Sequence, residues 1–524
     1  MKKVLTLLFN AIVLFGFAAP TDTIPPLMPP RPPQNYHLAP HIRLERNEQM
    51  MLTNLAIFIR FADEEEFSET LQPINQMFND STPNGISVYN YYNSMTYGKI
   101  NYQTVFTNNI QDTAIISFQD VHPRAYYQPR SSSNPEGYSG MGIALLRRNE
   151  MLANAIDYVD SLHLVDSTTN LDGNNDGLID NISFILSGDV DGWDDLLWPQ
   201  MDFFDTTYFD ANINGKALYA FNLEFANSSD YFKTSTFCHE MGHSLGLPDL
   251  YHYYNYQYIL PVYLWDMMGM NDMQQVSAII KYKFLGVIDE PTEITEDGHY
   301  VLNSLTSSDE NNCYFIRSST HPDQWFTIEY RNKDDFMETV PHSGVIIGRW
   351  YDWAYLYTSG NTNFNYTYIQ HLYWVFRPNS SNDITNGNVN NAAFGYNNRT
   401  SFGPNTNPHP YLTDGTPETS FEITNIQYNG NQASFDVHFL NVGVETHESS
   451  SVRIYPNPTD GIVTISSAAF NEVQLFDAYG KLLGKWPAES ETMQLNLSRH
   501  AAGIYFVKIL THDGTTEVER ILKR

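Results

Sequence analysis

The segment from Cys238 to Asp249, CHEMGHSLGLPD, constrains this chain more than any other stretch of its sequence. His239 and His243 stand four residues apart, so on a helix their side chains lie on one face, a turn apart. Two imidazoles at this spacing can share one zinc ion, and Glu240 beside the first can reach a water molecule on that metal. The spacing therefore predicts a metal-binding helix with a general base next to it.

The residues after the second histidine fit the same site. Gly246 permits a positive φ where the helix ends, and Pro248 prevents the helix from resuming, so the chain can turn back. Asp249 is then placed to be a third ligand beside His239 and His243. The alternative is an amphipathic helix whose histidines are solvated or satisfied by hydrogen bonds. The register of Gly246 and Asp249 with the histidine pair favours a zinc hydrolase with Glu240 as its catalytic residue.

Composition limits the partners that the protein can have. The 29 Lys and Arg residues against 60 Asp and Glu residues give a formal net charge of −31, which argues against nucleic acid and anionic membranes as partners. A length of 524 residues exceeds what one hydrophobic core normally serves, so several domains are expected. The two cysteines, Cys238 and Cys313, exclude a disulfide-rich scaffold but leave a single bridge between them open.

The start of the chain indicates export. Two lysines, an apolar run and small residues follow one another over residues 1–19, which is typical of a signal peptide. A membrane anchor is the alternative, but the apolar run is too short to span a bilayer comfortably. Residues 20–50 contain a proline-rich stretch that predicts an extended pro-segment or spacer. We expect a secreted or outer-surface protein without a transmembrane anchor in its mature form.

Hydrophobic periodicity divides the rest of the chain into three domains. Residues 51–290 mix helices and strands and hold the metal motif, whose helix we expect to begin at a capping hydroxyl, Thr234 or Ser235. Residues 291–440 carry short strands between Asn, Gly, Ser and Pro turns, which predicts a β-sandwich. A polar linker at 441–451 leads to a small β-domain at 452–524. Within 51–290 we expect strands at 52–61, 99–106, 182–186 and 217–225 and helices at 86–97, 141–164 and 274–285.

A second candidate metal site lies in the segment DGNNDGLID. Its spacing matches the first nine positions of a calcium loop, with a glycine at position six. Position twelve is Ser183 instead of the usual bidentate glutamate, so calcium affinity would be modest. The alternative is a connection rich in Asx-turns that holds no ion. The predicted oxygen ligands are the side chains of Asp172, Asn174, Asp176 and Asp180 and the carbonyl of Leu178.

A tight turn rich in methionine, Trp265–Met270 (WDMMGM), follows the zinc motif. HExxHxxGxxD together with such a turn resembles the metzincin peptidases, and the resemblance implies that Met268 lies beneath the metal. More narrowly, residues 239–251, 265–268, 281–288 (KYKFLGVI) and 326–331 (FTIEYR) resemble the immune inhibitor A family of secreted bacterial metallopeptidases. Met267 and Met268 as ordinary core residues are the alternative. Some metzincins carry a tyrosine two residues after this methionine, whereas this chain has Met270.

The C-terminal segment carries YPNPTDG near residue 455 and AGIYFVK near residue 505. Residues 452–524 resemble the type A sorting domain of the type IX secretion system, which implies passage through that machinery. A generic carbohydrate-binding or spacer module is the alternative.

The sequence as a whole predicts an α+β protein: a metzincin-like zinc peptidase domain, a β-sandwich and a small C-terminal β-sandwich sorting domain. The expected function is hydrolysis of extracellular protein or peptide substrates by a zinc endopeptidase that also binds calcium. The alternative from another class is a cell-surface adhesive or glycan-binding protein with a vestigial metal site.

Overall fold

The computed structural model describes residues 49–107, 114–193, 195–252, 259–351, 371–440, 453–466, 470–477, 481–487, 492–511 and 516–524. The expected signal peptide, nearly all of the proline-rich segment and the linker therefore lie outside the described residues. The chain divides into two compact units, Met1–Leu440 and Asn441–Arg524. The described chain is mostly β-sheet with few helices, as expected for a protein that contains β-sandwiches.

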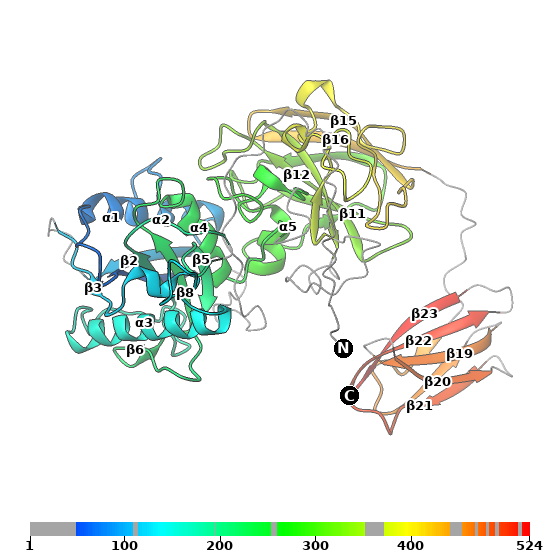
Figure 1. The fold of residues 1–524 in the computed structure, drawn as a ribbon. Coiled ribbons are helices and arrows are strands. Elements are labelled where there is room, and N and C mark those ends of the chain that lie inside the picture. Colours follow the sequence, from blue (N-terminus) through cyan, green and yellow to red (C-terminus); the bar gives the residue numbers. More distant parts are fainter. Residues whose placement is uncertain are drawn as a thin grey trace, which may run out of the picture. The chain divides into compact units, whose positions relative to one another are not determined.

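The first part of the larger unit is a mostly parallel sheet with helices on both faces (Figure 1). Its strands follow the order β2-β1-β4-β8-β5, and β3 pairs with the end of β1. Strand β5 runs antiparallel to β8, whereas the other neighbours in this order run parallel. The strands are β1 (Met50–Arg60), β2 (Ile100–Phe106), β3 (Phe118–Gln119), β4 (Asn181–Leu186), β5 (Gln200–Phe203) and β8 (Ala220–Phe225), and the helices are α1 (Leu71–Asn79), α2 (Val88–Met95), α3 (Met141–Ser161) and α4 (Thr234–Ser244). A separate hairpin joins β6 (Asn212–Ile213) to β7 (Lys216–Ala217).

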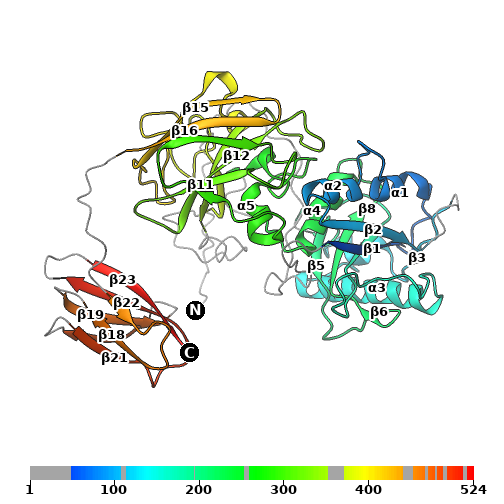
Figure 2. The same ribbon diagram turned by 180° about the vertical axis from the view of Figure 1, so that it is seen from behind.

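Strand β1 shows why the sheet needs a helical layer on each side. Successive side chains of a strand point to opposite faces, and both faces of β1 are apolar. Leu52 and Phe58 enter a core shared with α1, α2 and α4, while Ile57 and Ile59 enter a second core against α3. Figure 2 shows the same two layers from behind.

Most predicted elements of this region are confirmed, but two helix starts differ, and the strand expected at 217–225 begins only at Ala220, as β8. Helix α4 begins at Thr234, but its N-cap is Lys233, and no side chain caps it. The expected helix at 274–285 begins only at Ala278, as α5 (Ala278–Ile280) followed by a π-helical turn at Lys281–Leu285. The side chain of Gln274 binds the Asp266 carbonyl instead of pointing outward from a helix, which delays the helix start. Gly286 ends the turn at φ +64°, as its position predicts.

The second part of the larger unit is the expected β-sandwich. A sheet in the order β14-β13-β12-β11-β9 faces a sheet in the order β10-β16-β15, and both contribute to one core. Phe326 of β12, Val345 of β13 and Phe435 of β16 are among its fully buried members. The strands are β9 (Thr292–Glu293), β10 (Gly298–Asn303), β11 (Cys313–Arg317), β12 (Gln324–Arg331), β13 (Gly344–Tyr351), β14 (Tyr373–Val375), β15 (Phe421–Asn429) and β16 (Gln432–Phe439).

The boundary expected between residues 290 and 291 does not separate two compact bodies. One hydrophobic cluster contains Phe237 and Met268 from the metal-motif region together with Phe315, Trp325 and Trp350 from the sandwich. Both parts accordingly fall within a single compact unit that ends at Leu440. The sequence missed this because each part alone has the strand and helix patterns of a domain.

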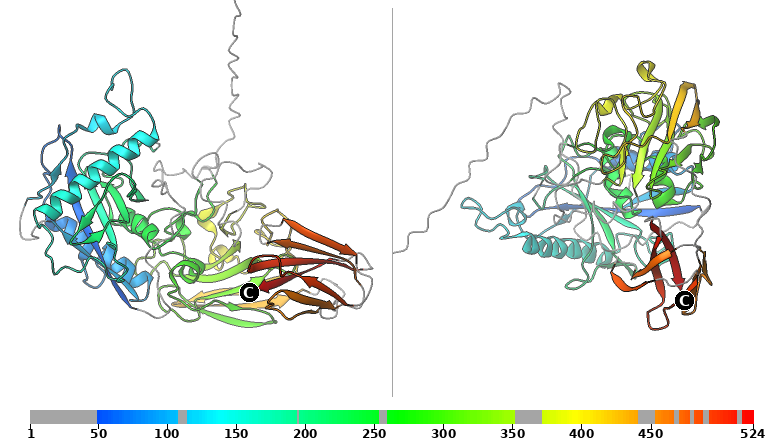
Figure 3. Two further views of the ribbon diagram at one scale, coloured as in Figure 1. Left: turned by 90° about the horizontal axis from the view of Figure 1, so that it is seen from below. Right: turned by 90° about the vertical axis from the view of Figure 1, so that its right-hand side faces the viewer.

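The smaller unit is a β-sandwich of its own (Figure 3, orange to red strands). Its sheets follow the orders β17-β18-β21 and β20-β19-β22-β23 around a core that includes Val463, Leu475 and Val507. No helix in the described part of the chain is long and apolar enough to cross a membrane. The strands are β17 (Arg453–Tyr455), β18 (Ile462–Ser466), β19 (Phe470–Asp477), β20 (Leu482–Pro487), β21 (Thr492–Asn496), β22 (Gly503–Thr511) and β23 (Thr516–Lys523).

Candidate metal centre

Helix α4 is held rigidly inside the larger unit. Every residue from Thr234 to Ser244 is buried, and the helix contacts α2, β5 and β8. The Tyr92 hydroxyl donates to the Cys238 carbonyl at 2.7 Å, and the Ser244 hydroxyl donates to Asn181 Oδ1 at 2.8 Å. Cys238 and Cys313 are both buried free thiols, so the bridge that the sequence left open is not formed. A helix fixed along its length can position side chains accurately.

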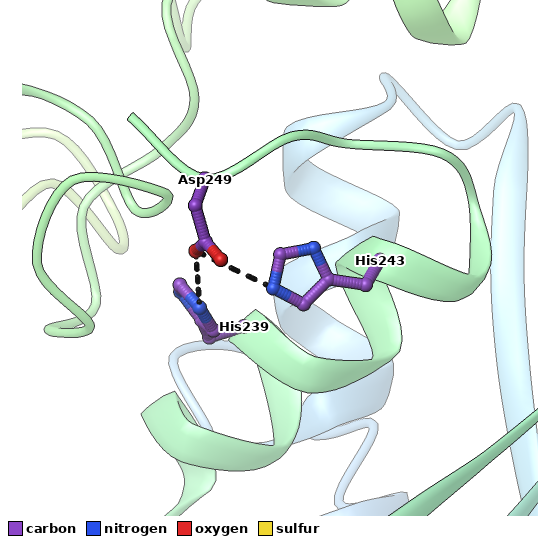
Figure 4. Close-up of side chains that lie close together, drawn as sticks. All are labelled: His239, His243 and Asp249. Carbon is purple, nitrogen blue, oxygen red and sulfur yellow. Dashed lines mark ion pairs between the residues drawn. The ribbon is translucent and has the colours of Figure 1, made fainter. Parts of the chain in front are cut away.

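His239, His243 and Asp249 come together at one point, as the sequence predicts (Figure 4). Asp249 Oδ1 lies 3.1 Å from His239 Nε2 and 3.4 Å from His243 Nε2. One ligand atom from each of the three residues lies within 4.8 Å of the other two. All three side chains are buried. This is a cluster of two imidazoles and one carboxylate, shielded from bulk water.

The other ring nitrogen of each histidine is already engaged. His239 Nδ1 lies 3.1 Å from the Met267 carbonyl, and His243 Nδ1 lies 2.7 Å from the Leu247 carbonyl. A carbonyl can only accept, so each Nδ1 carries a proton, and Nε2 is the nitrogen that can give its lone pair to a metal ion once it is deprotonated. Within the described residues neither Nε2 atom makes a hydrogen bond of acceptable geometry. Two buried lone pairs aimed at one point, with a carboxylate opposite, fit a zinc ion.

The turn after α4 delivers Asp249 to this point. Gly246, two residues beyond the end of α4, has φ +88°, a conformation that a residue with a side chain rarely adopts. The Leu250 amide then donates to the Met268 carbonyl at 2.8 Å, which fixes the segment next to Asp249. The expected roles of Gly246 and Pro248 in turning the chain agree with this path.

Burial and charge shift the pKa values of the cluster in opposite directions. Burial alone would lower the pKa of His243, but the Asp249 carboxylate outweighs it and raises the pKa to about 9. Burial would raise the pKa of Asp249, yet His243 and His239 hold it well below its usual range. Burial also raises the pKa of Glu240 well above its usual range, against the attraction of His243, with a further increase from the Glu224 carboxylate. The protonation of each of the three predicted ligands therefore depends on the charge of the other two.

Glu240 lies beside the ligands, fully buried on α4. Neither of its carboxylate oxygens has a hydrogen-bond partner of acceptable geometry within the described residues. Glu224 of β8, which no sequence motif indicates, is equally buried and equally without a hydrogen-bond partner of acceptable geometry within the described residues. Burial raises its pKa well above the usual range. A single glutamate in an apolar strand gives no sequence signal, because only the packing of α4 on β8 brings it near Glu240.

The methionine-containing turn underlies α4. Met268 is fully buried, and its Sδ lies 3.4 Å from where a Cβ on Gly242 would stand. Asp266 Oδ1 accepts the Met268 amide at 2.9 Å, and Asp266 Oδ2 accepts both the amide and the hydroxyl of Ser277 at 2.7 Å. The turn is therefore packed against the helix that carries both histidines.

The predicted calcium ligands lie in one loop, but their oxygens face protein donors. Asp172 accepts the Gly177 amide at 3.0 Å and pairs with Lys216 at 2.5 Å. Asp180 Oδ2 accepts the amides of Thr53 and Gly173, each at 2.8 Å. Asn174 and Asp176 bond to each other and to nearby amides, and the Leu178 segment bridges to Ala217. Calcium binding by Asp172, Asn174, Asp176, Leu178 and Asp180 stays a prediction.

A row of hydrogen-bonded polar side chains, which no sequence motif indicated, lies close to the candidate metal centre. His252 Nε2 is 2.7 Å from His371 Nε2, and His371 Nδ1 is 3.2 Å from Asp383, which also pairs with Arg349. A small pocket is lined by Asp249, His252 and His371 together with Leu250, Tyr251, Pro261, Leu372 and Tyr373. No spacing rule could have joined His252 to His371, because 119 residues separate them.

Comparison with known proteins identifies the C-terminal unit. Residues 453–524 match the family model described as the secretion system C-terminal sorting domain. This confirms the sorting domain that the sequence resembles, and the type IX machinery therefore exports the chain to the cell surface or the medium. No curated protein matches the chain at a significant level.

Solved structures give only remote likenesses. OgpA from Akkermansia muciniphila is 8% identical, with 92% of this chain and 95% of that chain covered and a TM-score of 0.24. PorZ, a surface component of the type IX secretion system of Porphyromonas gingivalis, is 14% identical over 43% of this chain and 37% of that chain, with a TM-score of 0.14. An immunoglobulin-like β-sandwich protein of Bacteroides vulgatus is 12% identical over 14% of this chain and 86% of that chain, with a TM-score of 0.13. TM-scores this low carry no argument about fold or activity.

Proposed function

We propose that this exported protein is a zinc-dependent endopeptidase of the immune inhibitor A type, with a metzincin-like metal site. The observation that carries the proposal is the convergence of two histidine Nε2 atoms and one Asp249 oxygen, with both Nδ1 protons fixed on carbonyls. A cluster that served only to stabilise the core would gain little from burying two imidazole nitrogens that make no hydrogen bond of acceptable geometry within the described residues. A zinc ion satisfies the ring nitrogens and the carboxylate together.

Zinc, when bound, supplies Lewis acidity that makes a water molecule a nucleophile near neutral pH. In the proposed mechanism Glu240 takes a proton from the attacking water and passes it to the leaving amide nitrogen. Asp249 contributes a negative charge, which offsets more of the metal's charge than a third imidazole would. The Met267 and Leu247 carbonyls keep the two rings oriented throughout the reaction.

Strand β5 lies next to the helix that carries both histidines. It ends the strand order of its sheet and runs antiparallel to β8, and it contacts α4. All four residues of β5 are buried, so this strand helps to enclose the metal site. The proposed substrates are proteins or peptides, whose amide bond the chemistry above would hydrolyse.

The test compares wild type with Glu240→Gln and with the control Glu150→Gln on the exposed face of α3. Glu240→Gln should keep stoichiometric zinc, because the ligands are untouched, and should lose roughly 10²- to 10⁴-fold in casein hydrolysis. Glu150→Gln should match wild type in both, and a chelator should abolish wild-type activity. Undiminished hydrolysis by Glu240→Gln would exclude this assignment.

The same measurements distinguish the proposed peptidase from the alternative, a surface-adhesive or glycan-binding protein. A wild-type protein that neither holds zinc nor cleaves casein or a peptide library, but binds a glycan or protein surface, would support that alternative. Parallel libraries of bare and glycan-bearing peptides would show whether the substrate is general protein or glycosylated peptide.

A further inference from the structure

Two segments singled out by their sequence, residues 281–288 and 326–331, have no part in the proposed chemistry. The structure brings them together in a buried charged cluster behind the methionine-containing turn. Lys281, Glu329 and Arg331 are all buried, together with Glu338. Lys281 Nζ donates to Gln275 Oε1 at 2.6 Å, directly after the turn. The cluster therefore borders the segment that follows Met268.

Arg331, at the end of β12, uses its guanidinium to hold that segment. Nη1 donates to the Trp265 carbonyl at 2.6 Å, and Nη2 donates to the Gln275 carbonyl at 2.9 Å. Glu338 and Glu329 lie 2.5 Å and 3.1 Å from the same guanidinium and balance its charge. Arg331 thus clamps the backbone on both sides of the methionine-containing turn.

Two further hydrogen bonds tie the turn region to the sandwich. Glu329 Oε2 accepts the Ala278 amide at 2.7 Å. Trp265 Nε1 donates to the Val389 carbonyl at 2.7 Å. The turn between these ties carries the Met267 carbonyl, which lies 3.1 Å from His239 Nδ1. A continuous path of contacts therefore runs from strand β12 through the turn to a predicted metal ligand.

A buried ion cluster is a poor way to gain stability alone, because desolvating the charges offsets most of their attraction. An apolar cluster of similar volume would stabilise the fold at least as well. What the guanidinium adds is a rigid fork of donors that holds two carbonyls at fixed positions. The geometry therefore favours a role in positioning over a role in stability.

We propose that Arg331 is a positioning residue of the metal centre: through the Trp265 carbonyl it fixes the turn whose Met267 carbonyl orients His239. The sandwich is then part of the catalytic unit and not a spacer behind it. The identity of the metal as zinc rests on the proposed function. The contacts by which Arg331 holds the turn do not depend on it.

The test is Arg331→Lys in the full chain, because lysine keeps the charge but cannot hold two carbonyls and Glu338 together. The zinc Kd, measured by competition with a chromophoric chelator, should rise about 10- to 100-fold, the usual cost of losing an outer partner of a metal ligand. Amide hydrogen exchange of residues 266–270 should accelerate at least about tenfold, with or without zinc.

Two controls separate positioning from general destabilisation. Arg317→Lys, on the neighbouring strand and paired with Glu293, should leave the zinc Kd and the exchange rates unchanged. Ile347→Val, in the sandwich core, should lower Tm without changing the zinc Kd. If Arg331→Lys does not fold, Glu338→Gln replaces it, because the neutral amide keeps the shape but weakens the pairing that holds the Arg331 guanidinium, and it should show the same changes at smaller amplitude.

Wild-type zinc affinity and wild-type exchange in a folded Arg331→Lys or Glu338→Gln variant would overturn the positioning role. A wild-type protein that binds zinc but cleaves nothing would remove the proposed function and leave the positioning role standing. If the wild-type protein binds no zinc, amide hydrogen exchange of residues 266–270 is the deciding measurement. Exchange rates in Arg331→Lys equal to those of wild type would then overturn the role of Arg331 in holding the turn.

Discussion

Asp249 shows most clearly how one residue defines the candidate site. Its carboxylate is buried and faces the Nε2 atoms of both histidines, whose charge lowers its pKa. A neutral side chain of the same shape would keep the packing and lose the charge that attracts a divalent cation. A substitution of this one residue therefore tests metal binding most directly.

We expect Asp249→Asn to raise the zinc Kd by at least about 100-fold, since loss of an outer partner alone costs roughly 10- to 100-fold. Equilibrium dialysis with metal analysis measures this effect. Asp272→Asn, an exposed aspartate near the same turn, is the matched control and should bind zinc like wild type. Equal zinc affinity in Asp249→Asn and wild type would exclude Asp249 as a ligand.

Local spacing was enough to predict His239, Glu240, His243 and Asp249, because all four lie within one helix and the turn after it. Arg331 and His371 could not be assigned roles in this way. Their partners lie 66 and 119 residues away, and only tertiary packing brings them together. Glu224 was missed for a related reason. In the sequence, a glutamate within an apolar strand cannot be told from a solvated one, and only the packing of helix α4 on the sheet buries it.

At the scale of elements, periodicity found the long amphipathic segments and missed the short buried ones. Strand β5 has four residues, all buried, so it shows neither alternation nor length. The start of α5 was predicted too early because Gln274 and Gln275 have good helix propensity but use their side chains to hold the turn and Lys281. Tertiary hydrogen bonds outweighed local preference at this helix start.

The loop at residues 172–180 carries a prediction about pH and calcium. Burial raises the pKa of Asp180 to about 6, against the hydrogen bonds from the Thr53 and Gly173 amides. The folded state then binds this proton more tightly than the unfolded state, whose value is near 3.8. The free energy of unfolding contributed by Asp180 should therefore decrease as pH rises from about 4 to about 6 and stay reduced above that. Urea unfolding at several pH values measures this, and Asp180→Asn should remove that part of the dependence.

Calcium should oppose this pH-dependent decrease in the free energy of unfolding, because a cation in the loop stabilises the ionised Asp180 carboxylate. Added calcium should raise Tm more at pH 7 than at pH 5, where Asp180 is largely protonated. A Tm that responds to neither calcium nor a chelator would contradict calcium binding by this loop.

At the scale of the whole molecule, the two units have separate cores. The three large clusters draw only on residues up to Val437, and the fourth draws only on residues from Val463 onward. The sequence correctly predicted the second unit from its turn motifs and strand pattern. It could not predict that the metal-motif region and the sandwich share a cluster, because the apolar residues that join them also fit separate cores.

Removal of residues 441–524 should leave the Tm and the proposed peptidase activity of the larger unit unchanged, because no core residue is lost from it. The truncated chain should no longer appear outside a bacterium that has the type IX system, because the sorting domain is gone. Fractionation followed by immunoblotting measures its location, and purified protein gives the activity per bound zinc. Loss of activity together with loss of export would show that the units depend on each other.

The bond between Trp265 and Val389 joins residues 124 positions apart. During synthesis the histidine motif leaves the ribosome some 140 residues before Val389, a delay of roughly 10–30 s at ordinary translation rates. Throughout that interval the chain carries the predicted ligands without the hydrogen bond that ties Trp265 to the sandwich. A fragment cut before Val389 lacks this hydrogen bond as well. Under the proposed function, hydrolysis would become available only after the residues around Val389 have folded onto the methionine-containing turn, so the nascent chain would be latent.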